Sequence, residues 1–463
     1  MMKKNIFCAL AMAATLVCPG AKAETGDTLT MIVGSYTESE NDEGIYVYRF
    51  NQNDGTASKV SSVKAGNPSY IALGKGGDRI YSVNEYGDGR QAASAFKFDR
   101  DKGTLSFINS QPTREGANGD DWFSAEARGE KPKTHNSGAD PCFVLAGNGF
   151  IATANYTGGD VSLFPTFKDG SLMAQSQHFD FFEGEPTKQA HLHCVRPTPD
   201  GKYLLACDLG NDCLYRFELR NDTTDAGEVY FVSSPEIAFK GEKGSGPRHI
   251  TFSPDGQHAY LLNELNGHVC VFDYSDGKLT LIQDIPAKPE DGPGSADIHL
   301  TPDGKFLYAS RRLKDNGITI FAIDGKTGKA RRVGYQPTGM HPRNFNITPN
   351  GKYLLAACRD DNVIETYKID PKTGLLEKTG EGIKLHKPVC IIFAEQEIAE
   401  QQKHAATPSA NRSESQENRT ESQGFSTFQQ PEKNISGIRK FFSGLLQSIS
   451  VIFFTTTGIA FVC

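Results

Sequence analysis

The chain has 463 residues, enough for one large domain or two ordinary ones, and contains 47 glycines, 29 phenylalanines and 16 tyrosines but one tryptophan. This composition favours many short strands joined by tight turns. A formal net charge of −7 argues against a nucleic-acid partner.

Residues 1–23 have the three parts of an export signal. Lys3 and Lys4 precede an apolar run over residues 6–18, and Ala21-Lys22-Ala23 is a small-x-small cleavage site. We therefore expect cleavage after Ala23 and an exported, periplasmic protein. A buried N-terminal helix and lipid modification of the last cysteine in the apolar run are the alternatives.

Several stretches repeat one pattern, in which two apolar segments flank a Pro-Asp-Gly or Pro-Asn-Gly turn. One copy is "GPRHITFSPDGQHAYLLNE", residues 246–264. A regular period of about 50 residues with strand texture is typical of a β-propeller. The turn glycines Gly201, Gly256, Gly304 and Gly351 are 55, 48 and 47 residues apart, and weaker copies begin at Asn67 and Asp140.

Two further strand-like segments follow each hairpin, so one repeat predicts a blade of four antiparallel strands. Six repeats are visible, and residues 388–395 with residues 29–38 and 44–50 would supply a seventh. Pairing of the N- and C-terminal strands would close the ring and remove free sheet edges. We predict an all-β fold, one seven-bladed β-propeller over residues 28–396. The even period argues against a two-domain β-sandwich, which is the alternative.

Two further segments lie outside this pattern. The insertion at residues 111–137, with Trp122, is either a functional lid or disordered. Residues 397–463 form a separate tail, polar and predicted to be disordered as far as residue 438. Its apolar end, residues 441–463, is long enough to span a bilayer or is not part of the fold. We expect the protein to contact a membrane only if this apolar C-terminal segment is a real part of the protein.

The predicted hairpins bring many charged residues to one face of the ring. A hairpin returns the chain to where it began, so residues before its first strand and after its second strand should surround the central channel. Charged residues beside core strands are costly unless they are paired or used. Ties between blades are the structural alternative for each of them. The residues in these positions are His191, His193, Arg248, His249, Asp297, Arg343, Glu85, Asn155, Asp208, Glu264, Arg311, Arg312 and Arg359.

This collection suits a small anionic substrate, because arginine binds carboxylate or phosphate through two N–H groups and histidine can act as a base near neutral pH. His191 and His193 face the same side of a strand and could bind zinc. A third matching ligand is not obvious and the arginines would repel a cation, so we expect no metal and no cofactor. A disulfide between Cys207 and Cys213 is compatible with the spacing but not required by it.

These motifs resemble the bacterial lactonase family of seven-bladed propellers, of the 6-phosphogluconolactonase type, and are similar to the fungal carboxy-muconate lactonizing enzymes. The resemblance covers residues 30–395. It rests on "ANYTGGDVSLFP", "QAHLHCVRPTPDGKYLLACDLGND", "GPRHITFSPDGQHAYLLNEL", "SADIHLTPDGKFLYASRR" and "HPRNFNITPNGKYLL".

The resemblance implies a hydrolase in which His193, Arg248, Glu264 and Arg312 are catalytic, with His193 as a general base titrating near 6.5. The motif around Arg312 has Arg311 where the family usually has asparagine, so Arg311 is a rival for the same role. The further substrate-binding candidates are His191, Arg343, Arg311, Asp208, Asn155 and Glu85.

The implied reaction is hydrolysis of 6-phosphogluconolactone to 6-phosphogluconate, in the pentose phosphate pathway, by a monomer or dimer. Three alternatives remain: a lactonase for a different periplasmic lactone, a lactonizing isomerase, and a non-catalytic ligand-binding propeller. The export signal favours the first alternative, because sugar-phosphate metabolism is cytosolic. The clustered arginine, histidine and glutamate residues argue against the last.

Overall fold

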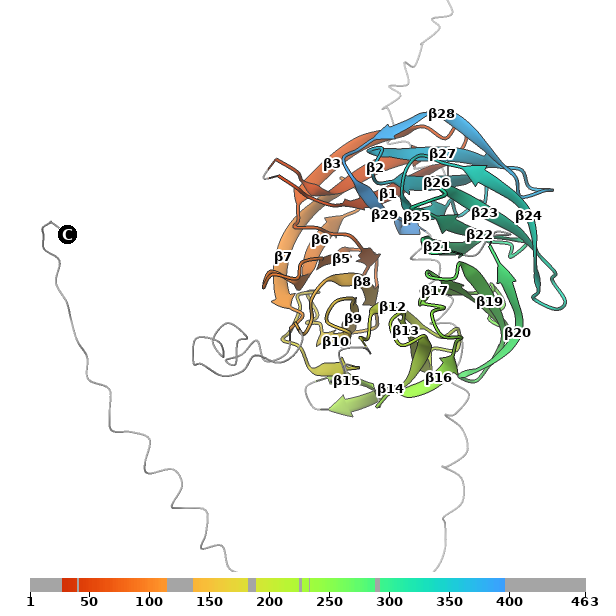
Figure 1. Cartoon of the computed structure of the whole chain (residues 1–463). Coiled ribbons are helices and arrows are strands. Elements are labelled where there is room, and N and C mark those ends of the chain that lie inside the picture. Colours follow the sequence, from red (N-terminus) through yellow and green to blue (C-terminus); the bar gives the residue numbers. More distant parts are fainter. Residues whose placement is uncertain are drawn as a thin grey trace, which may run out of the picture. The chain divides into compact units, whose positions relative to one another are not determined.

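The computed structural model describes residues 27–39, 41–114, 136–181, 189–224, 227–232, 234–287 and 292–395. In these ranges, 29 strands form seven antiparallel sheets around a central channel (Figure 1). The predicted all-β, seven-bladed β-propeller is therefore confirmed. The predicted export signal, Trp122 and the predicted tail from residue 397 lie outside the described residues.

Six blades follow one another along the chain. The first blade contains β4 (Ile71–Leu73), β5 (Arg79–Asn84), β6 (Ala92–Asp99) and β7 (Thr104–Pro112). The second blade contains β8 (Pro141–Ala146), β9 (Phe150–Asn155), β10 (Asp160–Pro165) and β11 (Gln177–Asp180). The third blade contains β12 (Leu192–Pro197), β13 (Tyr203–Asp208), β14 (Cys213–Thr224), β15 (Gly227–Val232) and β16 (Glu236–Lys240). The fourth blade contains β17 (Pro247–Phe252), β18 (His258–Asn263), β19 (His268–Ser275) and β20 (Lys278–Pro286). The fifth blade contains β21 (Ser295–Leu300), β22 (Phe306–Arg311), β23 (Gly317–Ile323) and β24 (Ala330–Pro337). The sixth blade contains β25 (Pro342–Ile347), β26 (Tyr353–Cys358), β27 (Val363–Ile369) and β28 (Leu376–Lys384).

The seventh blade joins the two ends of the propeller. Its strands are β29 (Pro388–Phe393), β1 (Thr28–Ser35), β2 (Gly44–Asn51) and β3 (Ala57–Lys64), in that order. β29 pairs antiparallel with β1, and the Glu395 carboxylate accepts the backbone N–H of Thr30 at 3.0 Å. The blue β29 and the red β1 lie side by side in Figure 1. The predicted closure by N- and C-terminal strands is therefore confirmed.

The blade that begins with β12 departs from the repeat. The first part of β14 pairs with β16, the blade's outer strand, whereas its second part pairs with β15 in a separate hairpin. This extra hairpin is specific to one blade, and the repeat pattern did not predict it.

Hydrogen bonds within the Pro-Asp-Gly turns explain why the repeated sequence forms hairpins. The N–H of Gly201 donates to the carbonyl of Thr198 at 2.9 Å, and the Asp200 carboxylate accepts both the Thr198 hydroxyl and the Lys202 N–H. Gly201 has a φ of 68°, which glycine adopts without strain. The corresponding turns at residues 253–257, 301–305 and 348–352 make the same bonds.

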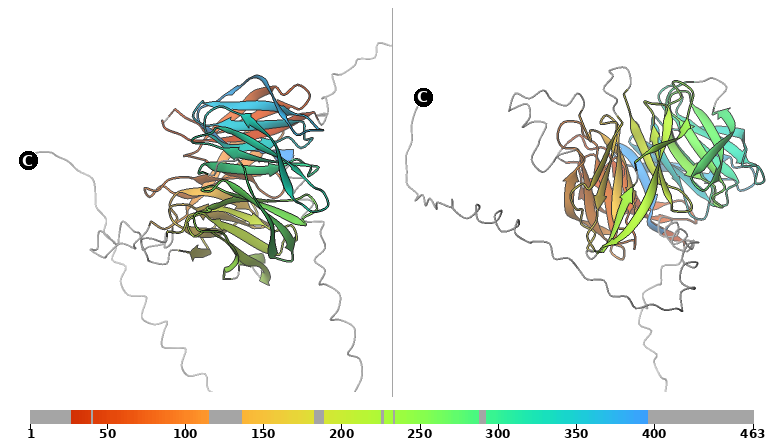
Figure 2. Two further views of the ribbon diagram at one scale, coloured as in Figure 1. Left: turned by 45° about the vertical axis from the view of Figure 1, so that its right-hand side comes forward. Right: turned by 90° about the horizontal axis from the view of Figure 1, so that it is seen from below.

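The first strand of each blade lies beside the channel (Figures 1 and 2). The apolar core packs between neighbouring blades. The seven cysteines of the described ranges are buried free thiols, so Cys207 and Cys213 form no disulfide in this structure. Among the described residues, no helix has the length and hydrophobicity needed to cross a membrane.

Candidate active site

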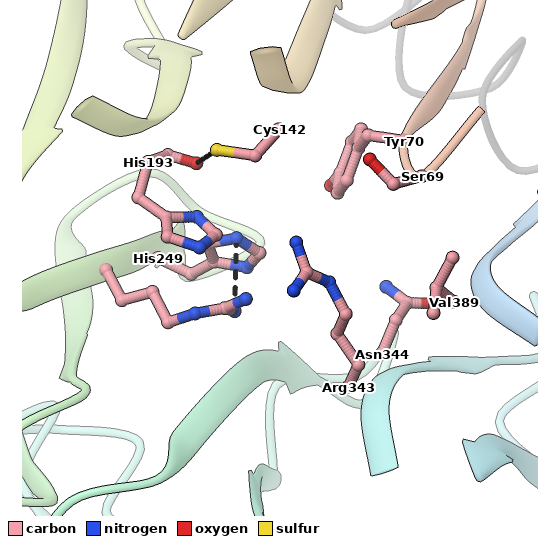
Figure 3. A pocket seen from close by; sticks show the side chains of 9 residues that line it. Ser69, Tyr70, Cys142, His193, His249, Arg343, Asn344 and Val389 are labelled. Atoms are coloured by element: carbon pink, nitrogen blue, oxygen red, sulfur yellow. Dashed lines mark hydrogen bonds between the residues drawn. The ribbon is translucent and has the colours of Figure 1, made fainter. Parts of the chain in front are cut away.

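β-Bulges near the start of the inner strands turn side chains toward one cavity. In β8, β12, β17 and β25 the register with the second strand shifts at Cys142, His193, Arg248 and Arg343. A bulge leaves one residue without a cross-strand partner and changes the direction of its side chain. All four side chains line a small cavity, which is shown in Figure 3.

A second group of site residues comes from the ends of the second strands. Glu85, Tyr156, Glu264 and Arg312 each follow the last residue of β5, β9, β18 and β22, respectively. They line a larger cavity of about 420 Å³, which shares Cys142, His193 and Arg343 with the small one and is the size of a small-molecule site. Its other lining residues are Asp140, Cys142, Thr157, His193 and Arg343.

Glu264 holds two of the arginines. Its Oε1 accepts from Nη2 of Arg312 at 2.9 Å, and its Oε2 lies 2.8 Å from Nε of Arg248. Burial by itself raises the pKa of Glu264, but Arg312, Arg248 and Arg343 together bring it below its ordinary value. Glu264 is therefore an ionised carboxylate between two guanidinium groups. Burial and Arg248 also lower the pKa of Arg312, to about 10, so Arg312 remains charged at neutral pH.

Arg343 belongs to a second charged group on the other side of the cavity. Its Nη2 donates to Oε2 of Glu85 at 3.3 Å, and its guanidinium lies 5.5 Å from the centre of the Tyr36 ring. The Tyr36 hydroxyl donates to the other oxygen of Glu85 at 2.7 Å. Burial disfavours the charge of Arg343, but Tyr36 and Glu85 outweigh it and raise the pKa of Arg343.

His193 connects the two cavities and is neutral. Its side chain is buried, and its Nδ1 has no hydrogen-bond partner among the described residues. Burial, and then the charge of Arg248, lower the pKa of His193 well below its ordinary value of 6.5. The expected titration of this group near 6.5 is therefore wrong, because the sequence does not reveal how completely the ring is buried.

Four of the predicted site residues, His191 and three others, line neither cavity. Asn155, Asp208 and Arg311 are the last residues of β9, β13 and β22. The residues that line the larger cavity from the second strands stand one position later, just after the strand end. Side chains alternate along a strand, so these three point to the other side. Asn155 donates to Ser162 at 3.0 Å, and Nη1 of Arg311 lies beside Gly267.

Asp208 and His191 have structural partners. Asp208 accepts the backbone N–H groups of His191, Gly210 and Asn211 and so fixes the loop after β13. His191 stacks on Tyr156 with 4.3 Å between ring centres and lines neither cavity. We therefore do not include Asn155, Asp208, Arg311 or His191 in the proposed site. Arg312 is the arginine of its motif that reaches the cavity.

The sequence did not single out Tyr36, Ser69, Asp140, Cys142, Tyr156 or Thr157. A signal for some of them exists, because Ser69 and Cys142 follow a proline at the start of a repeat, as Arg248 and Arg343 do. Within the described ranges, no group of three or more histidine, cysteine, aspartate or glutamate side chains is placed to hold a metal ion.

The fold and this cavity define a class of protein. A family model described as "Lactonase, 7-bladed beta-propeller" matches residues 30–393, and the chain belongs to this family. The protein is thus a lactone-hydrolysing enzyme.

Individual relatives support this class. The chain is 34% identical over 360 residues to the 6-phosphogluconolactonase of Formosa agariphila, covering 75% of this chain and 94% of the relative. A crystal structure of a Bacteroides fragilis protein, proposed to be a 6-phosphogluconolactonase, is 45% identical with a TM-score of 0.71 and covers 81% of this chain and 99% of that one. The periplasmic gluconolactonase of Pseudomonas aeruginosa is 29% identical with a TM-score of 0.66, and the match covers 79% and 99%.

Proposed function

We propose that the enzyme opens the ring of a sugar lactone, with 6-phosphogluconolactone as the first candidate substrate. The observation that carries this proposal is that an unprotonated His193 is shared by two cavities, which Arg248, Arg312 and Arg343 line between them. The names of the 6-phosphogluconolactonase relatives support the choice of substrate.

In the proposed mechanism, His193 takes a proton from water while the water oxygen attacks the lactone carbonyl carbon. Arg248 and Arg312 stabilise the negative charge that develops on the carbonyl oxygen. When the ring C–O bond breaks, the imidazolium returns its proton to the leaving alkoxide, and a hydroxy acid is released. Glu264 acts on the arginines rather than on the histidine, because both of its oxygens face guanidinium nitrogens.

A second candidate is the corresponding lactone without phosphate. The larger cavity is lined by the carboxylates of Glu85, Asp140 and Glu264, and each of the three arginines already faces one of the two glutamates. A phosphate dianion would have to compete with these glutamates for the arginines, whereas a substrate without phosphate would not. The relative from Pseudomonas aeruginosa, which is named a gluconolactonase, supports this second candidate.

A direct comparison tests both candidates. The purified enzyme is given each lactone, and acid release is followed at constant pH. We expect catalysed hydrolysis with a higher kcat/KM for 6-phosphogluconolactone. A preference for gluconolactone would select the second candidate, and failure to accelerate either reaction would refute the proposed function.

A further inference from the structure

Asp297 is a buried carboxylate that no step of the proposed mechanism uses. It lies on β21 and accepts from Nδ1 of His249 at 2.8 Å, from Nε2 of His299 at 3.0 Å and from the side-chain amide of Asn344 at 2.6 Å. The backbone N–H groups of Ile298 and Phe345 also donate to it. Burial disfavours its charge, but His299 and His249 hold the pKa of Asp297 well below its usual range, so it is ionised.

This carboxylate determines which nitrogen of His249 carries the proton. An ionised carboxylate only accepts hydrogen bonds, so Nδ1 of His249 must donate to Asp297. Burial and Arg248 lower the pKa of His249 to about 4, so the ring is neutral at pH 7. Its Nε2 therefore keeps a lone pair, and this atom lies 3.4 Å from Nη1 of Arg248 (Figure 3).

The contact with His249 is one of three that hold the guanidinium of Arg248. Nη1 also donates to the carbonyl oxygen of Ala296, and Nε faces Glu264 at 2.8 Å. A guanidinium group is planar and rigid, so fixing Nε and Nη1 also sets the direction of its remaining nitrogen. The Arg248 residue is only 1% exposed, and its side chain lines the small cavity.

We propose that Asp297 and His249 are positioning residues that fix the guanidinium of Arg248 in the active site. This inference rests on the role of Arg248 in the proposed function. The competing explanation is that Asp297 only ties together three blades, through His249 on β17, His299 on β21 and Asn344 on β25. In the positioning explanation, Asp297 acts through Nδ1 only to leave Nε2 of His249 as an acceptor for Arg248. In the competing explanation, the bond at Nδ1 itself is what matters.

Two conservative variants separate these atoms. The amide of glutamine reaches the place of Nε2 in histidine, whereas the amide of asparagine reaches the place of Nδ1. His249→Gln therefore keeps an acceptor for Arg248 and changes the bond to Asp297. His249→Asn keeps a donor for Asp297 and removes the contact with Arg248. The variants are compared by lactone turnover and by thermal unfolding.

We expect His249→Asn to lower kcat by about 10- to 100-fold with little change in KM, because displacement of an orienting group by about 1 Å has effects of this size. We expect His249→Gln to keep kcat within about fivefold of the original enzyme. The opposite ranking, equal losses in both variants or no loss in either would overturn the proposal. Equal and large losses would instead make His249 a proton-transfer group.

A measurement on the unchanged protein keeps the proposal testable if a variant fails to fold. The ¹⁵N chemical shifts of the His249 ring distinguish its two neutral tautomers. We expect the tautomer with the proton on Nδ1 at pH 7, and a proton on Nε2 would overturn the proposal because that atom could not accept from Arg248. Absence of lactone turnover would refute the proposed function, whereas the tautomer is decided in either case.

Discussion

At the scale of single residues, the arginines of the cavity are part of the folded core as well as of the site. Among the described residues, Arg248 is the largest of the side chains that are less than 2% exposed, although it stands at the bulge near the start of β17. Its charge is balanced by Glu264, and its Nη1 bonds the backbone at Ala296. A change at this position therefore affects both binding and folding.

We predict that Arg248→Ala lowers kcat/KM by about 30- to 1000-fold, the size of a lost charged contact worth about 2–4 kcal/mol in the transition state. We also predict a loss of about 1–3 kcal/mol in the free energy of unfolding, because Ala296 loses a buried donor while Glu264 keeps Arg312. Denaturant unfolding and initial rates measure the two effects. Normal turnover by the folded fraction of the variant would show that Arg248 is only a structural residue.

The buried state of His193 predicts an unusual pH dependence. A general base must be unprotonated, and the pKa of His193 lies well below 6.5 because of burial and Arg248. Activity should therefore be lost only as the pH falls below that lowered pKa. We predict that kcat/KM shows no step between about pH 6 and pH 8, and that His193→Ala removes most of the rate. A step centred near 6.5 would mean that the ring is exposed to water in solution.

At the scale of elements, strand alternation explains which site residues the sequence could and could not place. The hairpin pattern correctly brought the ends of the second strands to one face. It could not tell Asp208 or Asn155, which point into a blade, from Glu264, which points into the cavity. The two groups differ by one position along the strand, and the sequence does not locate the end of a strand to within one residue. The bulges at Arg248 and Arg343 were likewise not predicted from the hairpin pattern.

The loop before β21 shows how an element holds two site residues at once. The N–H of Gly294 donates to the carbonyl of Glu264, and the N–H of Arg312 donates to the carbonyl of Gly294. Gly294 has a φ of 115°, and an added Cβ would lie 2.3 Å from the carbonyl oxygen of Arg312. We predict that Gly294→Ala moves both residues and lowers stability and activity together.

Gly201→Ala is the matched control. Gly201 also has a positive φ, of 68°, but an added Cβ would meet nothing within 4 Å. The Gly201→Ala substitution should lower the free energy of unfolding by about 1–2 kcal/mol, through backbone strain alone, and leave kcat/KM unchanged. Similar unfolding energies and similar activities for the two alanine variants would contradict the role assigned to Gly294.

At the scale of the whole molecule, the repeat and the family resemblance were enough to predict the number of blades and their closure. A hairpin motif that recurs at a near-constant period leaves few other architectures. The β14–β15 hairpin could not be predicted in this way, because it occurs in one blade only. The lowered pKa values of His193 and His249 could not be predicted either, since they depend on burial created by the assembled ring.

Closure also predicts which truncations the propeller tolerates. We predict that residues 24–396 fold alone, whereas residues 24–387, which lack β29, do not form a stable monomer. β29 provides Ile391 and Phe393 to the core shared with β1, and without it β1 would become an exposed, largely apolar sheet edge. Circular dichroism, size-exclusion chromatography and lactone turnover of the two fragments measure the difference. An insoluble or unfolded 24–396 fragment would contradict the predicted domain limits, and a soluble, active 24–387 fragment would show that the ring does not need its closing strand.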